Sequence, residues 1–281
     1  MNRFFSKGVF STYVFVLIAL FACTNDEEFP STGKPGLPSS FEYPDGSRFS
    51  FAYANGQLSR ILAPDGSGTD FHYKNGELSS LSFFPPEGMA DGHGWVEFEK
   101  IDERTIQVRH TGEPMLSAFQ LEEITLDEHG YPVRITDFGA YDYQGTNEDR
   151  SPQELLWEGK TFTLLTFDLS SGNVLKQEMY SRTDSMLLLT NQYKYTSTPG
   201  MLSGVKLPRW FTGYWGSRQV TQSDPYYRLF FNTHNNLSEE LGCDIRTCES
   251  LDATYEYRYD ENGFPSWVSN EAFPDGVQIR Y

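Results

Sequence analysis

The chain contains few of the residues, and none of the motifs, by which common enzymes and metal proteins are recognised. It has three cysteines and five histidines in 281 residues, and no HExxH, GxSxG, GxxxxGK or GxGxxG segment. The histidines are scattered along the chain: His72, His93, His110, His129 and His234. The sequence therefore predicts no catalytic residue, no metal site and no cofactor, and we expect a protein that is not an enzyme.

Positive charge is also scarce. The chain has 22 lysines and arginines against 39 aspartates and glutamates, for a formal net charge of −17. Nucleic acids and anionic lipid surfaces bind proteins whose cations neutralise phosphates, so a chain this acidic is a poor partner for either. Its net charge favours neutral or cationic ligands.

Long apolar runs are missing apart from one near the amino terminus. Residues 9–22 form that run, after the cations Arg3 and Lys7, and it ends in LFAC at Cys23. The run is shorter than the ~20 residues that a membrane-spanning helix needs. A positive start followed by a short apolar segment is typical of a secretory signal.

The segment ending at Cys23 resembles a bacterial lipoprotein signal. This resemblance implies that residues 1–22 are removed, that Cys23 carries a thioether-linked diacylglycerol, and that the new amino terminus is acylated. Each buried methylene contributes about 0.8 kcal/mol, so several acyl chains hold a protein stably on a membrane. An ordinary secretory signal with a chance cysteine is the alternative.

The residues after Cys23 indicate where such an anchor is displayed. The acidic cluster TNDEE resembles the export signal of surface lipoproteins of the Bacteroidota, which implies an outer-membrane protein facing the cell exterior. A solvated acidic tether on the periplasmic face is the alternative. Residues 29–40 are rich in Pro, Gly and Ser, as a spacer is. The predicted organisation is a signal peptide at 1–22, a lipidated tether at 23–40 and one all-β domain at 41–281.

The two other cysteines, Cys243 and Cys248, lie in the short segment GCDIRTC. An envelope location permits oxidation, and a local disulfide is favoured over free thiols. No second cysteine pair accompanies them, so they do not form a four-ligand zinc site.

Turn dipeptides recur every ten residues from Asp45 onward. They are Asp-Gly at 45–46 and 65–66 and Asn-Gly at 55–56 and 75–76. Both pairs favour type I′ hairpin turns, and the eight residues between them suit a strand. A twenty-residue repeat, FAYANGQLSRI then FHYKNGELSSL, lies within this meander, and weaker copies extend to YEYRYDENGFPSWV near the carboxyl terminus.

This pattern predicts an all-β, repeat-built antiparallel meander of about 14 to 18 strands. Expected strands include 95–100, 106–110, 161–167, 186–195 and 277–281. A sheet this large is expected to close into a barrel or partial barrel, or to split into a large sandwich. At most a turn of helix is expected, near 153–157 and 237–241.

A membrane-spanning porin is the rival architecture. It requires an apolar band on the outer face of nearly every strand. The charged residues that interrupt such a band are Arg60, Lys74, Glu97, Arg109 and Lys176.

The hairpin units resemble the YD repeats of Rhs-type secreted bacterial proteins, most clearly in YRYDENGFPSWV. Together with the signal, the cysteine and the spacer, they resemble a family of secreted Bacteroidota lipoproteins of unknown function with a porin-like fold. This resemblance covers about 240 residues and implies the fold. It implies no catalytic residues.

The segment PRWFTGYWG, residues 208–216, is the best candidate for a binding surface. Its large planar side chains, Trp210, Phe211, Tyr214 and Trp215, are suited to stacking on sugar rings or other apolar faces. The alternative is that they fill the end of a barrel.

Adjacent acidic residues are interpreted as solvated charge. The pairs Glu122 with Glu123 and Glu239 with Glu240 offer carboxylates for a glycosidase, but sequence adjacency does not give the spatial separation that this reaction needs. His72 and His110 alternate with apolar neighbours and are expected to face solvent.

These features predict a lipid-anchored envelope protein whose partner is the membrane and which binds a neutral glycan or amphiphile at its surface. The alternatives are a structural or adaptor subunit of an outer-membrane complex and, less favoured, a carboxylate-dependent hydrolase. The oligomeric state is not predicted.

Overall fold

The computed structural model describes residues 36–89, 93–112, 115–142, 154–218, 230–245, 249–250 and 252–281. Its strands are β1 (Ser40–Glu42), β2 (Arg48–Ala54), β3 (Gln57–Leu62), β4 (Gly68–Lys74), β5 (Glu77–Phe84), β6 (Gly94–Lys100), β7 (Thr105–Gly112), β8 (Met115–Leu126), β9 (Pro132–Asp142), β10 (Glu154–Glu158), β11 (Thr161–Phe167), β12 (Val174–Ser181), β13 (Leu187–Pro199), β14 (Asn235–Asp244), β15 (Glu249–Ser250), β16 (Ala253–Thr254), β17 (Glu256–Tyr259), β18 (Pro265–Asn270) and β19 (Phe273–Arg280). One α-helix, α1 (Arg209–Ser217), is present in these residues.

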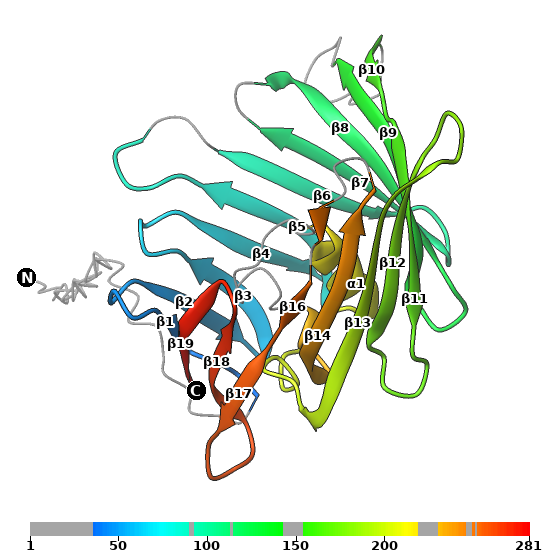
Figure 1. Ribbon diagram of the computed structural model, residues 1–281. Helices are drawn as coiled ribbons and strands as arrows, with labels where there is room; N and C mark the ends of the chain where they lie inside the picture. Colours follow the sequence, from blue (N-terminus) through cyan, green and yellow to red (C-terminus); the bar gives the residue numbers. More distant parts are fainter. Residues whose placement is uncertain are drawn as a thin grey trace, which may run out of the picture.

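The 19 strands form one antiparallel sheet in which most neighbours along the chain are neighbours in space. The sheet curls into a nearly closed barrel, because the three-residue strand β1 pairs with both β2 and β19. The barrel is drawn in Figure 1, with α1 inside the curve of the sheet. The predicted all-β meander and its closure into a barrel are confirmed.

The strand pairing between β14 and β16 is short. Only two residue pairs, Glu239 with Thr254 and Glu240 with Ala253, join these strands. Beyond them Tyr255 donates its backbone N–H to the Ser238 carbonyl, and the Tyr257 hydroxyl donates to the Leu237 carbonyl at 2.6 Å. One backbone hydrogen bond and one side-chain hydrogen bond therefore extend the strand pairing there.

Turns fall at the predicted ten-residue spacing, but two turn types alternate. At 55–56 and 75–76 both residues have positive φ, 55° at each asparagine and 79° and 84° at the glycines, as a type I′ turn requires. At 45–46, 65–66 and 262–263 only the glycine does. The predicted type I′ form is wrong at 45–46 and 65–66, because an aspartate carboxylate accepts the backbone N–H two residues later and favours a three-residue loop. The carboxylate of Asp260 makes the same contact at the 262–263 turn.

The internal repeat supplies the barrel core. Phe51 and Phe71, the first aromatic residues of the two repeat units, are 1% and 5% exposed. The two later apolar positions are also buried in both units: Leu58, Ile61, Leu78 and Leu81. Since side chains alternate along a strand, the residues between them face outward. Each repeat unit is thus one hairpin with an apolar inner face.

The outer face of the barrel carries charge on several strands. Arg60 pairs with Asp70 across β3 and β4, and Lys176 pairs with Glu178 on β12. Glu97 and Arg109 are cross-strand neighbours on the outside of β6 and β7. A porin has the reverse alternation, with lipid-facing apolar and lumen-facing polar residues. In the part of the chain described, no helix is long and apolar enough to cross a membrane.

The helix α1 lies where the sequence predicted no helix. Conversely, the short helical turns expected at 153–157 and 237–241 are strands, β10 from Glu154 and β14. The helix contains Gly213 and Gly216, which lower intrinsic helix propensity. Packing inside the barrel supplies the stability that propensity does not.

The barrel begins slightly before the predicted domain boundary. Leu37 is 7% exposed, the Pro38 carbonyl accepts a hydrogen bond from Tyr53, and the Ser39 N–H donates to the Arg280 carbonyl. The predicted spacer therefore overlaps the barrel over residues 36–40. The signal segment, Cys23 and the acidic cluster after it lie outside the described residues.

Candidate functional site

The aromatic segment predicted to bind a ligand, residues 208–216, forms most of α1, which lies inside the barrel (Figure 1). Phe211 and Tyr214 are 0% exposed, and Trp210 and Trp215 are half-buried. Phe98 of β6 packs on Trp210 with ring centroids 4.9 Å apart. The helix thus joins the core cluster of the barrel. Whether any of the four rings binds a ligand stays a prediction.

Two glycines let α1 pack closely against its neighbours. A Cβ atom on Gly213 would lie 2.7 Å from Phe167 and 2.8 Å from Pro132. One on Gly216 would lie 2.9 Å from the ring of Phe231. Any larger residue would push the helix away from its neighbours, so these glycines are a packing requirement.

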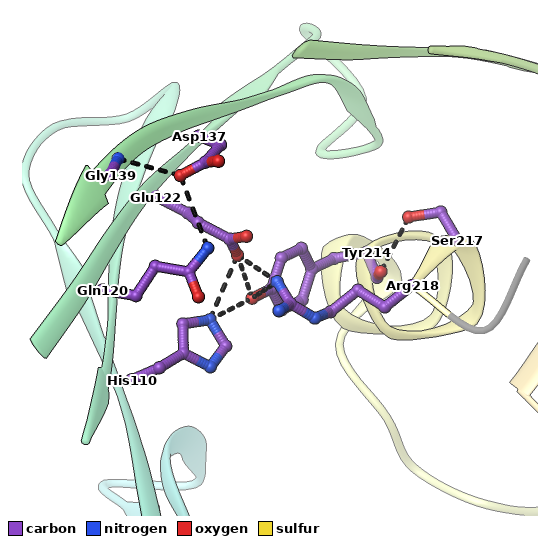
Figure 2. A network of polar contacts seen from close by, with 8 residues as sticks. All are labelled: His110, Gln120, Glu122, Asp137, Gly139, Tyr214, Ser217 and Arg218. Carbon is purple, nitrogen blue, oxygen red and sulfur yellow. Dashed lines mark hydrogen bonds and ion pairs between the residues drawn. The ribbon is translucent and has the colours of Figure 1, made fainter. Parts of the chain in front are cut away.

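A buried polar network holds the carboxyl-terminal end of α1 (Figure 2). The carboxylate of Glu122 on β8 accepts hydrogen bonds from the Tyr214 hydroxyl at 2.6 Å and from Arg218. His110 of β7 contacts Glu122 at 3.1 Å and the Tyr214 hydroxyl at 2.9 Å through Nε2. The side chain of Glu122 is 7% exposed and that of Arg218 is 30% exposed, so a buried carboxylate pairs with a partly exposed guanidinium.

The network fixes the charge of its members. Burial raises the pKa of Glu122, but the Arg218 guanidinium and the His110 and Tyr214 hydrogen bonds outweigh burial and lower this pKa to about 2. Burial lowers the pKa of His110 despite Glu122 and raises that of Tyr214 well above its usual value. Near neutral pH, Glu122 is therefore a carboxylate committed to Arg218, unsuited to donate a proton in acid catalysis.

A small cavity of about 210 Å³ adjoins the network and contains a second carboxylate, Asp137. Asp137 and Glu122 are directly paired residues of β9 and β8. Its carboxylate accepts from the Gly139 N–H at 2.8 Å. The two carboxyl groups project side by side from one sheet and do not face each other across a cleft, so the arrangement gives no support to the hydrolase alternative.

The acidic pairs alternate between the inside and the outside of the barrel. Glu122 and Glu240 are 5% and 1% exposed, and Glu240 accepts from Asn191 at 3.0 Å. Glu239 instead pairs with the exposed Lys194. The interpretation as solvated charge is therefore wrong for the two buried glutamates, because adjacent strand residues point to opposite faces.

The same alternation of strand residues shows that the prediction of solvent exposure is wrong for one of the two histidines, His110. His72 is exposed, as predicted, and contacts Ser82 at 2.8 Å. His110 is opposite the core residue Val96 and faces the interior, where its side chain is 18% exposed. Its neighbours along the strand gave no sign of the partners that the folded chain supplies.

An open cleft of about 930 Å³ lies at the other end of α1. The Asn-Gly turn at 75–76 and the segment leading into α1 border it. The apolar residues that line it, here called the apolar wall, are Leu78, Phe98, Ile106, Leu126, Leu207, Pro208 and Trp210. The volume lies within the range of small-molecule sites, and we call this space the α1 cleft.

Four exposed cations line the α1 cleft and are here called the basic rim: Lys74, Lys100, Lys206 and Arg209. Two carboxylates, Glu77 and Glu103, line it as well. Within the described ranges no rim residue has an ion-pair partner. Of the sequence-predicted aromatic residues, Trp210 lies in this cleft.

The predicted disulfide involves one described residue. Cys243 is half-buried in β14, opposite Thr190 and Ser250. Cys248 lies outside the described residues, so the disulfide stays a prediction. In the ranges that the structure describes, no group of three or more His, Cys, Asp and Glu side chains is placed to hold a metal ion.

Comparison with known proteins gives only weak structural alignments. No protein-family model and no curated protein matches the chain. A porin-like protein from Bacteroides vulgatus aligns at a TM-score of 0.34 and 8% identity, over 87% of this chain and 98% of that one. A porin-like protein from Bacteroides uniformis aligns at 0.34 and 13%, over 87% and 96%. Likeness at this level carries no conclusion about activity.

Proposed function

We propose that this chain is a lipid-anchored outer-membrane protein, displayed at the cell surface, whose barrel binds an amphiphile in the α1 cleft without catalysing a reaction. The observation that carries the proposal is the cleft itself, where an apolar wall lies beside charged and polar side chains. A ligand with an apolar and a polar part matches both. The periplasmic face of the outer membrane is the alternative location.

The exposure of the aromatic rings favours an amphiphile over a glycan. A sugar-stacking platform needs rings that meet the ligand from solvent. Phe211 and Tyr214 are fully buried, and Trp215 is stacked between Phe83 and Phe211. Only Trp210 contributes to the cleft, beside aliphatic side chains that suit an acyl or other apolar tail.

The test is a binding measurement with a neutral fluorescent amphiphile, N-phenyl-1-naphthylamine, displaced by dodecyl maltoside. We expect saturable binding to the mature protein and at least about tenfold weaker binding by Trp210→Leu, since large aromatic side chains dominate binding energy. The matched control is Trp95→Leu, because Trp95 is 43% exposed on the outside of β6.

A second variant guards against loss of folding in Trp210→Leu. Leu207→Asp places a charge in the apolar wall at a half-buried loop position. Failure of the parent protein to bind the probe contradicts the proposal. So does equal binding by the parent protein and Leu207→Asp.

The anchor is tested separately at Cys23. Replacing Cys23 with Ala is expected to release the protein from the membrane fraction, because acylation requires the thiol. Replacing Asp26, Glu27 and Glu28 together with Ala is expected to lower protease accessibility on intact cells while leaving the barrel folded. Unchanged partitioning of Cys23→Ala into a detergent phase contradicts the anchor.

A further inference from the structure

The α1 cleft carries charge of the opposite sign to the chain as a whole. The protein has a formal charge of −17, whereas the cleft is lined by four cations and two carboxylates. We propose that the amphiphile bound in the cleft has an anionic headgroup, a carboxylate or a phosphate, which the basic rim contacts while the tail lies on the apolar wall. This inference rests on the proposed function.

The unpaired state of the rim supports an anionic ligand. Two lysines on other strands of the barrel do have carboxylate partners: Lys176 contacts Glu178 at 2.8 Å, and Lys194 contacts Glu239 at 2.5 Å. Carboxylates outnumber cations in this chain by 39 to 22. Among the described residues the side chains of Lys74, Lys100 and Lys206 have no ion-pair or hydrogen-bond partner, so these three lysines are available to an external anion.

Hydrogen bonds hold in place the backbone segments that carry the basic rim. The Lys206 N–H donates to the Gly56 carbonyl at 2.8 Å, and the side-chain amide of Gln57 donates to the Gly76 carbonyl at 2.9 Å. Arg209 donates to the His129 carbonyl at 3.3 Å. These contacts join the two Asn-Gly turns and the start of α1, so ligand binding does not need to organise the backbone of the cleft.

The start of α1 adds to the positive potential of the cleft. The helix has no side-chain cap at Pro208 and no acidic residue in its first turn. A helix amino terminus carries a partial positive charge, which here is not offset by a nearby side chain of the first turn. The whole-chain charge favoured neutral or cationic ligands, but at contact distance the local charges dominate because more distant charges are screened.

The experiment compares three amphiphiles with the same twelve-carbon tail: dodecyl phosphate, dodecyl maltoside and dodecyltrimethylammonium. Each is titrated below its micelle concentration into the mature protein by calorimetry at low salt. We expect dodecyl phosphate to bind at least about tenfold more tightly than the other two. The advantage is expected to shrink as salt is added, because the rim is exposed.

Variants assign the effect to the rim. In Lys74→Gln/Lys100→Gln/Lys206→Gln, dodecyl phosphate binding is expected to weaken at least about tenfold while dodecyl maltoside binding is unchanged. The matched control is Lys160→Gln/Lys176→Gln/Lys194→Gln, which alters net charge equally at positions outside the cleft. Equal weakening by both triple variants overturns the inference.

The outcomes separate this inference from the proposed function. Binding of dodecyl maltoside as tight as that of dodecyl phosphate overturns the anionic headgroup and leaves the amphiphile site standing. Absence of binding by all three overturns both. Capture of phosphatidylglycerol vesicles without binding of dodecyl phosphate monomers overturns the inference in favour of contact with a membrane surface.

Discussion

The two ends of α1 lie in polar surroundings of opposite kinds. At its carboxyl-terminal end, Arg218 is paired with the buried carboxylate of Glu122 and with Tyr214. At its amino-terminal end, the basic rim has no ion-pair partner among the described residues. The pairing of Arg218 with a buried carboxylate fixes the helix to the barrel wall. Unpaired, exposed cations cost little to keep and remain free to contact a ligand.

The variant with the largest expected effect removes Arg218, the cation paired with the buried Glu122. Arg218→Met leaves the Glu122 carboxylate buried without its guanidinium and is expected to lower the free energy of unfolding by about 3 to 5 kcal/mol. Urea denaturation measures it. The control Lys194→Met breaks an exposed pair, 63% and 31% exposed, and is expected to cost less than about 1 kcal/mol. Similar losses in both variants would show that the network does not hold the helix.

The second prediction is that low pH destabilises the protein at the carboxyl-terminal end of α1, where Glu122 lies. The pKa of Glu122 is lowered to about 2 from its usual 4.5, so the folded state binds fewer protons than the unfolded state between these values. The stability from Glu122 is thus present above pH 4.5 and is lost as pH falls through about 2, amounting to about 3 kcal/mol. Denaturation measured from pH 6 to pH 2 checks this. Glu122→Gln is expected to flatten the dependence, and an equally steep curve in that variant contradicts the assignment.

The third test concerns the contact of α1 with the wall. Alanine favours helix over glycine by about 1 kcal/mol, yet Gly213→Ala is expected to destabilise the protein by about 1 to 3 kcal/mol, because its Cβ would strike Phe167 and Pro132. Thermal melting gives the sign. At Gly112 of β7 a Cβ would meet neighbours at ordinary distances, 3.5 Å or more, so Gly112→Ala is the control. A more stable Gly213→Ala would mean that the helix packs loosely.

The smallest expected change in the free energy of unfolding is at the amino-terminal end of α1, in the basic rim. The triple variant Lys74→Gln/Lys100→Gln/Lys206→Gln is expected to change the free energy of unfolding by less than about 0.5 kcal/mol, since exposed positions without partners contribute little. The same denaturation assay checks it. A loss of several kcal/mol would make the rim a structural element, which would remove the contrast between the two ends of the helix.

Much of the barrel was predictable because its strands follow local rules. The alternation around Phe51 and Phe71 and the Asn-Gly turns report which face is buried and where the chain reverses. Strands expected at 161–167 and near 95–100 are present as β11 and β6. Hairpins are built from sequence neighbours, so a single sequence contains the information for them.

The candidate site was less predictable because distant residues form it. Glu122 and Arg218 are 96 positions apart, and nothing in their flanking residues indicates the pairing. The helix itself, with Gly213 and Gly216, lacks helix-forming composition and exists because the barrel encloses it. The one useful signal was the crowding of aromatic residues around Gly213, which marked the segment without revealing its conformation. The cleft emerges only when turns at 55–56 and 75–76 meet the start of that helix.

The closure of the barrel by β1 has a consequence for the order in which the protein folds. Each hairpin of the meander joins residues a few positions apart, whereas β1 pairs Ser40 with Arg280, nearly the full length of the domain away. Contacts of such long sequence separation form slowly, because a large loop must close before they add stability. When the chain is synthesised from its amino terminus, β1 can pair with β2 at once. The other edge of β1 stays unpaired until β19 has been made. Truncation before β19 therefore leaves two open strand edges, and such edges invite pairing between copies.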